Sequence, residues 1–134
     1  MVKLTTMSNF LENAILDLVL RGVAYPGGNT IYAALFTSPT TDAGGGSEVS
    51  TIGTGYVRTQ ISTFDPPVAG QTSNSTTVSF PTAAVNWGLI THFALFDSSA
   101  GGNMLYHGPL TVPKLTNAGD TVILPPGNIT VLHD

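Results

Sequence analysis

From residue 30 onward the chain consists of short apolar segments separated by clusters of Gly, Pro, Ser and Asn, and this spacing constrains the fold more than any other feature. Short runs rich in β-branched and aromatic residues between turn-forming residues are typical of sandwiches and barrels. We therefore expect a mainly β, single-domain antiparallel β-sandwich, jelly-roll-like and spanning residues 30–134. The segments predicted as strands are 30–37, 56–64, 76–81, 89–97, 103–112, 120–125 and 128–134.

Two pairs of these segments predict β-hairpins. Segments 89–97 and 103–112 flank "DSSAGG", a loop somewhat longer than the two-residue ideal. Segments 120–125 and 128–134 are joined through "PPGN", whose Pro and Gly favour a tight turn. Segment 30–37, "TIYAALFT", is apolar on both faces, which predicts a central strand that is covered on both sides.

A single N-terminal α-helix is predicted over residues 9–21, "NFLENAILDLVLR", preceded by an N-terminal arm of residues 1–8. Asn9 and Glu12 have the spacing of a capping box, and Gly22 is a natural stop. We expect the helix to pack against the sheet through one apolar stripe at helical spacing, formed by Leu11, Ala14, Ile15 and Leu18.

The chain has 134 residues, which fits one domain, and only 9% of them are charged, against about 25% in an ordinary soluble domain. Its four Lys and Arg residues and net charge of −4 argue against a nucleic-acid partner. No apolar run approaches the ~20 residues of a membrane helix, and the start of the chain does not resemble a secretion signal, so no membrane partner is expected. Such a surface is either coated with Ser, Thr, Asn and Gly in a monomer or covered by other subunits. We favour the second interpretation, because charged side chains normally prevent association.

The stretch "TSPTTDAGGGSEVSTIGTGYVR", residues 37–58, is rich in glycine and hydroxyl groups, and it is either a ligand loop or a flexible connection between two strands. Its glycines are not followed by the Lys of a phosphate-binding loop, nor do they lead into a helix as in a dinucleotide fingerprint. Asp42 and Glu48 could share a calcium ion, but calcium loops have more densely spaced acidic ligands. We predict a mobile connection between strands unless a neighbouring element pins it. Whether residues 42–55 contact a partner or ligand stays open.

No residues with the spacing of a catalytic, cofactor or metal site are found, so the chain is not expected to be an enzyme or to need a cofactor. The absence of cysteine excludes thiol catalysis and Cys-based zinc sites. His92, His107 and His133 lack metal-binding spacing, although His92 and His107 lie on strands predicted to pair. No serine sits in a G-x-S-x-G turn. Trp87 is either a carbohydrate-stacking platform or a core residue, and the apolar strand after it favours the core.

Three stretches of the chain resemble a family of small virion structural proteins of tailed bacteriophages. They are "NFLENAILDLVLRGVAYPGGNTIYAALFTSPTTDAGGGSEVS", "GYVR" and "NWGLITHFALFDSSAGGNMLYHGPLTVPKLTNAGDTVILPPGNITV", which together cover nearly the whole chain. Members are described as tail-fibre-like, minor tail or head-decoration proteins, and the family supplies no catalytic residues. The stretch "STFDPPVAG", at the end of the predicted strand 56–64, departs from the family's pattern.

The resemblance implies a virion location, after assembly in the bacterial host cytoplasm. Our first expectation is a capsid decoration (cement) protein, a dimer or trimer that stabilises the major capsid protein lattice by mass action. The alternatives are a tail, baseplate or tail-fibre component bound to other tail proteins, and a glycan- or receptor-binding module that uses Trp87 and the glycine-rich loops. The apolar N-terminal segment is expected to help dock the subunit. The residues predicted at the interface are Val2, Leu4, Met7, Phe10, Arg58 and Trp87.

Overall fold

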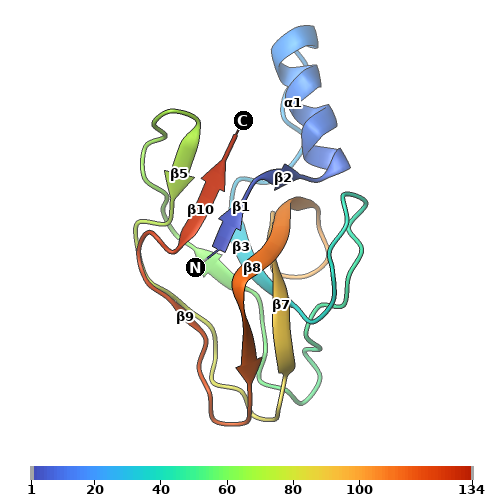
Figure 1. The fold of residues 1–134 in the computed structure, drawn as a ribbon. Coiled ribbons are helices and arrows are strands. Elements are labelled where there is room, and N and C mark those ends of the chain that lie inside the picture. Colours follow the sequence, from blue (N-terminus) through green and yellow to red (C-terminus); the bar gives the residue numbers. More distant parts are fainter. Residues whose placement is uncertain (1, 134) are drawn as a thin grey trace.

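The structure is a computed structural model that describes residues 2–133, and within this range it contains one helix and ten strands (Figure 1). The expected mainly β fold with a single N-terminal helix is confirmed. Within the same range, no helix is both long and apolar enough to span a membrane. In chain order the elements are β1 (Val2–Leu4), β2 (Thr6–Met7), α1 (Asn9–Arg21), β3 (Ile31–Phe36), β4 (Thr59–Ile61), β5 (Gln71–Ser73), β6 (Val78–Ser79), β7 (Gly88–Phe96), β8 (Met104–Thr116), β9 (Ile123–Leu124) and β10 (Ile129–Leu132).

Most strands belong to one mixed sheet with the order β4-β3-β7-β8-β1-β10-β5, and β2 pairs with the start of β8. Neighbouring strands in this sheet are antiparallel, with the exception of the parallel pair β1 and β10. Strands β6 and β9 form a separate antiparallel ribbon. This order is consistent with a β-sandwich-like domain, but it does not confirm a jelly-roll arrangement.

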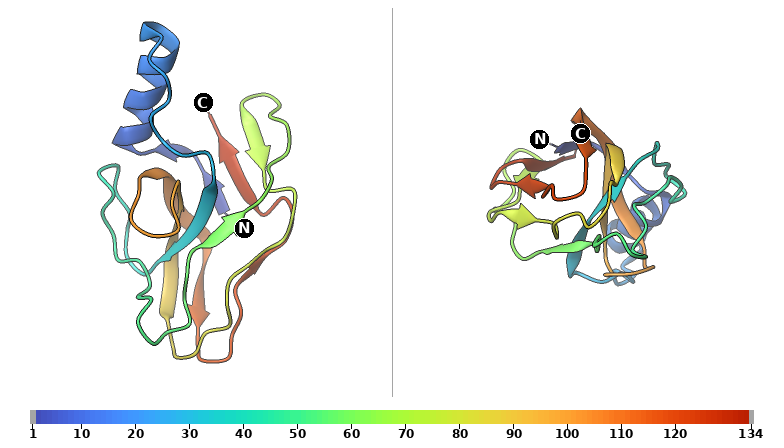
Figure 2. Two further views of the ribbon diagram at one scale, coloured as in Figure 1. Left: turned by 180° about the vertical axis from the view of Figure 1, so that it is seen from behind. Right: turned by 90° about the horizontal axis from the view of Figure 1, so that it is seen from below.

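The large sheet curls until its two edges are joined by the chain between β4 and β5. The amide of Asp65 donates to the Ser73 carbonyl at 2.8 Å, and the amide of Ser75 donates to the Thr63 carbonyl at 3.1 Å. In Figure 2 the end-on view shows strands surrounding a common interior. The main core fills this interior, and its largest fully buried members are Tyr56, Phe80, Phe93, Leu4, Leu35, Ile90, Ile129, Val2 and Val78.

Within the segment predicted as an N-terminal arm, residues 1–8, the structure has the strands β1 and β2, which belong to the sheet. Strand β1 lies between β8 and β10, where Val2 pairs with Ile129 on one side and with Leu110 on the other. Val2 and Leu4 are both 0% exposed. Their apolar character is therefore explained by the core.

The hairpin of β7 and β8 is confirmed, with two irregularities of register. The second predicted hairpin is wrong, because β9 pairs with β6 whereas β10 pairs with β1 and β5. The turn in "PPGN" does form, since the amide of Asn128 donates to the Pro125 carbonyl at 3.1 Å. The buried side chain of Asn74 binds both sides of this turn, donating to Pro125 at 3.0 Å and accepting from the Ile129 amide at 2.9 Å. The turn is thus held against the segment that follows β5, and it connects β9 of the ribbon with β10 of the large sheet.

Helix α1 has the predicted bounds but a different cap and a different environment. Its N-cap is Ser8, whose hydroxyl accepts a hydrogen bond from the Leu11 amide at 3.2 Å, and not Asn9. Gly22 closes the helix in the left-handed conformation at φ 66°, as expected. Only Leu11 and Ala14 are buried. The helix therefore does not lie along the sheet but projects from one end of the domain (Figure 1).

Candidate functional site

The glycine-rich connection between β3 and β4 is pinned by neighbouring elements. Asp42 accepts a hydrogen bond from His107 Nε2 of β8 through Oδ1 at 2.7 Å. The carbonyl of Asp42 accepts from the Asn9 amide at the start of α1 at 2.9 Å. Thr40 Oγ1 lies 2.8 Å from His107 Nδ1 on the other side of the ring. The segment predicted to be a mobile connection is thus tied to the helix and to the sheet.

Thr40, His107 and Asp42 have the connectivity of a hydroxyl–imidazole–carboxylate relay, the arrangement found in hydrolytic triads. Here the imidazole is buried, and the carboxylate is the exposed member, with 47% of its side chain accessible. The adjacent cavity is lined by Asp42, Ala43 and Gly44 and not by the Thr40 hydroxyl. We therefore interpret this cluster as a structural tie, in which both ring nitrogens of a buried histidine have hydrogen-bond partners.

A second network is centred on Arg58. Its Nε and Nη2 each donate to a different carboxylate oxygen of Glu48 at 2.9 Å, the bidentate geometry that makes such pairs strong. Nη1 donates to the carbonyls of Ser98 at 3.0 Å and Gly101 at 2.8 Å. The guanidinium also lies 3.6 Å above the centre of the Phe96 ring. The β3–β4 and β7–β8 connections are therefore fastened to one another by a single side chain.

Tyr56 extends this network into the core. Its hydroxyl donates to Glu48 at 2.7 Å and accepts from the Leu35 amide of β3 at 3.1 Å. Burial raises the pKa of Tyr56, and the hydrogen bond to Glu48 raises it further. The ring packs edge-on against Trp87, whose indole N–H donates to the Thr54 carbonyl at 2.8 Å. The phenol therefore stays protonated and serves as a buried connector.

The acidic and histidine side chains do not converge on one point. Asp42 and Glu48 bind separate partners, so they do not form the shared cation site considered from the sequence. Among residues 2–133, no group of three His, Cys, Asp or Glu side chains is arranged to hold a metal ion. His92 Nδ1 bonds to the neighbouring Thr91 hydroxyl at 2.8 Å. Burial lowers the pKa of His92, and His107 lowers it further.

The residues predicted to form an interface are mostly internal. Val2 and Leu4 lie in the core, and Trp87 is only 7% exposed. Core packing of Trp87 is confirmed, whereas the stacking platform for carbohydrate is wrong because the ring is covered. The Arg58 side chain is 8% exposed and is occupied by the network above. Met7 and Phe10 are half-buried near the start of the helix.

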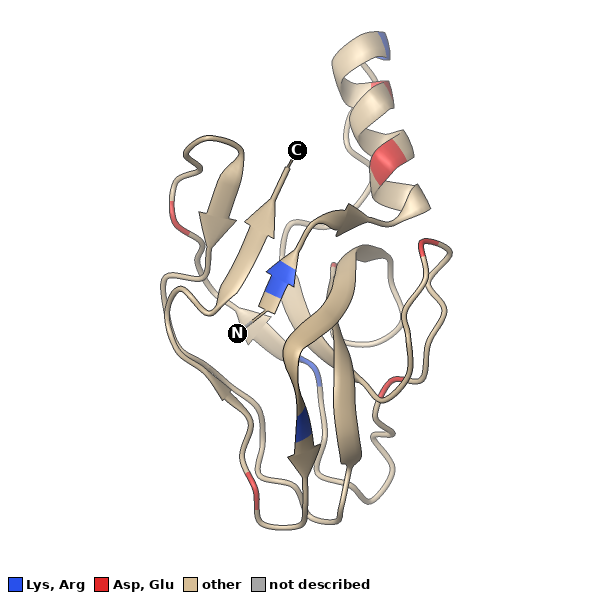
Figure 3. Cartoon of the chain, viewed as in Figure 1, with Lys and Arg blue, Asp and Glu red and all other residues tan. Residues whose placement is uncertain are grey.

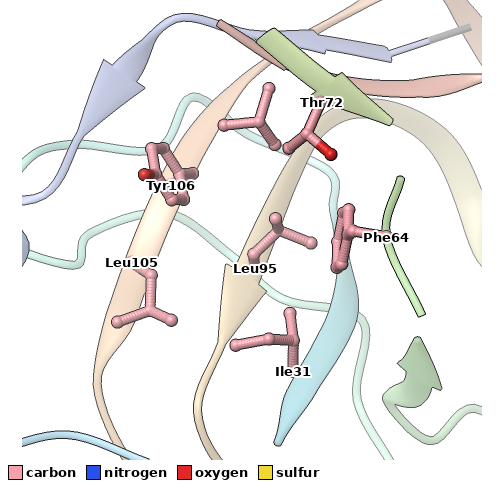
Figure 4. Close-up of a pocket in the computed structure, with 7 residues that line it drawn as sticks. Ile31, Phe64, Thr72, Leu95, Leu105 and Tyr106 are labelled. Atoms are coloured by element: carbon pink, nitrogen blue, oxygen red, sulfur yellow. The ribbon is translucent and has the colours of Figure 1, made fainter. Parts of the chain in front are cut away.

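An apolar cavity of about 200 Å³ opens at the end of the sheet from which the helix projects (Figure 4). Tyr106 lines it and pairs with Met7 of β2, directly before the helix. The Tyr106 hydroxyl lies 2.5 Å from His133 Nε2. The lining has no carboxylate or cation, so the cavity suits an apolar group. Its lining residues are Ile31, Phe64, Thr72, Leu95, Leu105, Tyr106 and Val131.

The projecting half of the helix is a feature that the sequence interpretation missed. The exposed fractions of its apolar side chains are 54% for Leu16, 71% for Val19 and 74% for Leu20, and Val23 just after the helix is 42% exposed. Leu16, Val19 and Leu20 recur at i, i+3 and i+4, the helical spacing that predicts a buried stripe. The signal was therefore present in the sequence as a second stripe beside the predicted one.

The opposite end of the domain also exposes apolar side chains, in two groups. Leu89 and Leu115 are cross-strand partners on β7 and β8 and are 48% and 61% exposed. Val112 and Ile123 border a common cavity and are 73% and 47% exposed. Fixed charges are sparse over the whole molecule, as Figure 3 shows. The domain thus presents weakly charged, partly apolar surfaces at both ends.

Comparison with known proteins gives one family. Residues 6–132 match the family described as "Podophage GP4 fiber I protein gp80". No curated protein matches the chain. The match spans the helix and the strands from β2 to β10, and so covers both ends of the domain.

Proposed function

This chain belongs to the family described as podophage GP4 fiber I protein gp80, and on that premise we propose that it is a structural subunit of a podophage tail fibre. The observation that carries this proposal is the family match over nearly the whole chain. A non-enzymatic role accords with side-chain networks that fasten loops and strands instead of facing a substrate cavity.

The surface supports a role in assembly. Exposed apolar patches on a weakly charged domain mark sites of contact with other proteins. This domain has them at both ends, on α1 and on the strand ends of β7 and β8. A subunit with contact surfaces at two ends can be bound between neighbours, as a position within a fibre requires.

The expected capsid decoration role is supported less well than the tail-fibre alternative, because the family's description names a fibre. The glycan- or receptor-binding alternative depended on an exposed Trp87, and it is not supported because Trp87 lies in the core. Other virion proteins, and further copies of the chain, are the proposed partners.

The test is to locate the protein on virions. Immunogold labelling with an antibody against the purified protein should place gold on the fibres near the tail. Quantitative mass spectrometry of the same virions should give far fewer copies of this protein than of the major capsid protein. Gold distributed over the capsid, with a copy number comparable to that of the major capsid protein, would refute the fibre role and support the capsid decoration role.

A further inference from the structure

The apolar cavity of about 200 Å³ is an extension of the main core that no side chain fills. Its residues Leu95 and Val131 belong to that core, and Ile31, Phe64 and Tyr106 pack against it. Figure 4 shows the rings of Phe64 and Tyr106 on opposite sides, with Leu95 and Ile31 between them. The cavity thus has walls of large apolar side chains that are positioned by the core.

A β-bulge shapes one wall of the cavity. Leu95 of β7 pairs with Tyr106 of β8. The next pair is Phe96 with Met104, so the register skips Leu105. Successive side chains of a regular strand point to opposite faces, whereas Leu105 and Tyr106 both line the cavity. Bulges re-aim side chains in this way, and they are frequent beside functional sites.

The mouth of the cavity is polar. A second cavity of about 230 Å³ adjoins the first, because the two share Thr72, Tyr106 and Val131. The second cavity adds Pro67, Gly70, Gln71 and His133 to the lining.

Tyr106 and His133 form a hydrogen-bonded pair at this mouth. Their ring centres are 5.5 Å apart, and the Tyr106 hydroxyl lies 2.5 Å from His133 Nε2. The His133 amide donates to the Gly70 carbonyl at 2.7 Å, which fixes the backbone of the histidine. Burial raises the pKa of Tyr106 above its ordinary value, so its hydroxyl keeps the proton. A hydroxyl is both donor and acceptor, and the Tyr106 oxygen can therefore bond to a ligand in addition to His133.

The interior of the cavity holds water weakly. A buried water typically makes about three hydrogen bonds. The lining offers two side-chain hydroxyls, and both have partners already, since Thr72 donates to the Asp65 carbonyl at 2.5 Å and Tyr106 bonds to His133. An apolar group gains affinity by displacing water that is poorly held.

We propose that the cavity binds a small amphiphilic molecule, with one aromatic ring or a short branched aliphatic chain inside and a single hydroxyl at the Tyr106–His133 pair. The volume sets the size of the apolar part, because an apolar cavity of about 150 Å³ in another protein binds benzene. Sites with apolar walls and a few polar groups are common in the mouths of β-barrels. The proposal goes beyond the fibre role and does not depend on where the protein is located in the virion.

The first test is a titration of the labelled full chain with two probes, monitored by two-dimensional amide NMR. The probe p-cresol carries a ring and a hydroxyl, whereas toluene carries the ring alone. Both should shift the amide signals of Leu95, Leu105 and Val131 in a saturable manner, because both fill the apolar part of the cavity.

Tyr106→Phe tests the polar mouth. It should weaken the binding of p-cresol about fivefold or more, since one hydrogen bond is lost, and it should leave the affinity for toluene unchanged. Tyr25→Phe is the matched control. The Tyr25 hydroxyl donates to the Gly28 carbonyl at 3.3 Å, but Tyr25 lines neither cavity, so both affinities should stay at the wild-type value.

Thr72→Phe tests the cavity itself, because it places a ring in the space that the probes would occupy. It should abolish the binding of both probes, whereas Thr51→Phe, at an exposed position that lines neither cavity, should not. Thermal melts show whether the variants fold, and Tyr106→Phe decides alone if Thr72→Phe does not. Three results would each overturn the proposal: no saturable shifts in the wild type, unchanged p-cresol affinity in Tyr106→Phe, or wild-type binding by a folded Thr72→Phe.

Discussion

Arg58 shows how one side chain in a chain with few charges organises two loops. Its guanidinium binds a carboxylate, two backbone carbonyls and an aromatic face at the same time. Arginine suits such a site because its planar fork presents several donors in fixed directions. From the sequence we predicted Arg58 on a strand and at an interface. Nothing in the sequence indicated that Glu48, ten residues earlier, is its partner.

We predict that Arg58→Ala lowers the free energy of unfolding by about 2–4 kcal/mol, because it leaves the partly buried Glu48 carboxylate without its cation. Arg21→Ala is the matched control. Arg21 also pairs with a carboxylate, Asp17 at 2.8 Å, but its side chain is 71% exposed, so the loss should be at most about 0.5 kcal/mol. Urea unfolding of the two variants at low protein concentration measures both values. Equal losses would contradict the structural role of Arg58.

Asp97 makes part of the stability depend on pH. Burial raises the pKa of Asp97, but hydrogen bonds from the Asn103 side chain and amide and from the Gly28 amide outweigh it, so that the pKa lies below its ordinary value of 3.8. A depressed carboxyl pKa contributes stability that is fully present above the unfolded pKa and is lost as the pH falls through the folded pKa. We expect the melting temperature to decline below about pH 4.

Asp97→Asn should decrease this acid-induced decline, since the amide does not titrate. Thermal melts of wild type and variant between neutral pH and pH 3 test the prediction, and parallel curves for the two proteins would contradict it.

At the scale of elements, local signals in the sequence were reliable and pairings were not. The bounds of α1 and its stop at Gly22 follow from helical periodicity and from left-handed glycine geometry, both of which are local. The cap moved by one residue to Ser8 because its hydroxyl also donates to the Met104 carbonyl of β8 at 2.5 Å, a contact between distant parts of the chain. Strands β1 and β2 were missed because segments of three and two residues carry too little periodicity to identify a strand.

Strand β1 should therefore be essential for folding. We predict that Leu4→Ala lowers the free energy of unfolding by about 3 kcal/mol or more, because it opens a cavity between β8 and β10 where the side chain is fully buried. Ile52→Ala, at an exposed position, should change it by at most about 0.5 kcal/mol. If Leu4→Ala keeps wild-type stability but fails to associate with other virion proteins, the docking role first expected for this segment would be correct after all.

At the scale of the whole molecule, the domain has few charged residues and exposes apolar side chains at both of its ends. The exposed Leu16, Val19 and Leu20 of α1 lie at one end, and Leu115 with its cross-strand partner Leu89 lies at the other. We predict that Leu115→Lys leaves the melting temperature within a few degrees of wild type but decreases incorporation into virions. Ile52→Lys, which adds the same charge at an exposed position outside this cross-strand pair, should be incorporated normally. Complementation of a phage lacking the protein, followed by quantification of the virion-bound protein, measures the effect. Normal incorporation of Leu115→Lys would show that this end is not a contact surface.

The sequence by itself determined those properties that depend on neighbours in the chain. These are the mainly β class, the helix and its end, the β7–β8 hairpin and the scarcity of charge, because periodicity, turn chemistry and composition all act over a few residues. Only the tertiary structure decided which distant segments meet. It placed Val2 beside Ile129, Glu48 against Arg58 and Trp87 inside the core, and it left the apolar side chains in the second half of α1 exposed. Such contacts depend on closing long loops and on filling one shared interior, and these are properties of the complete chain.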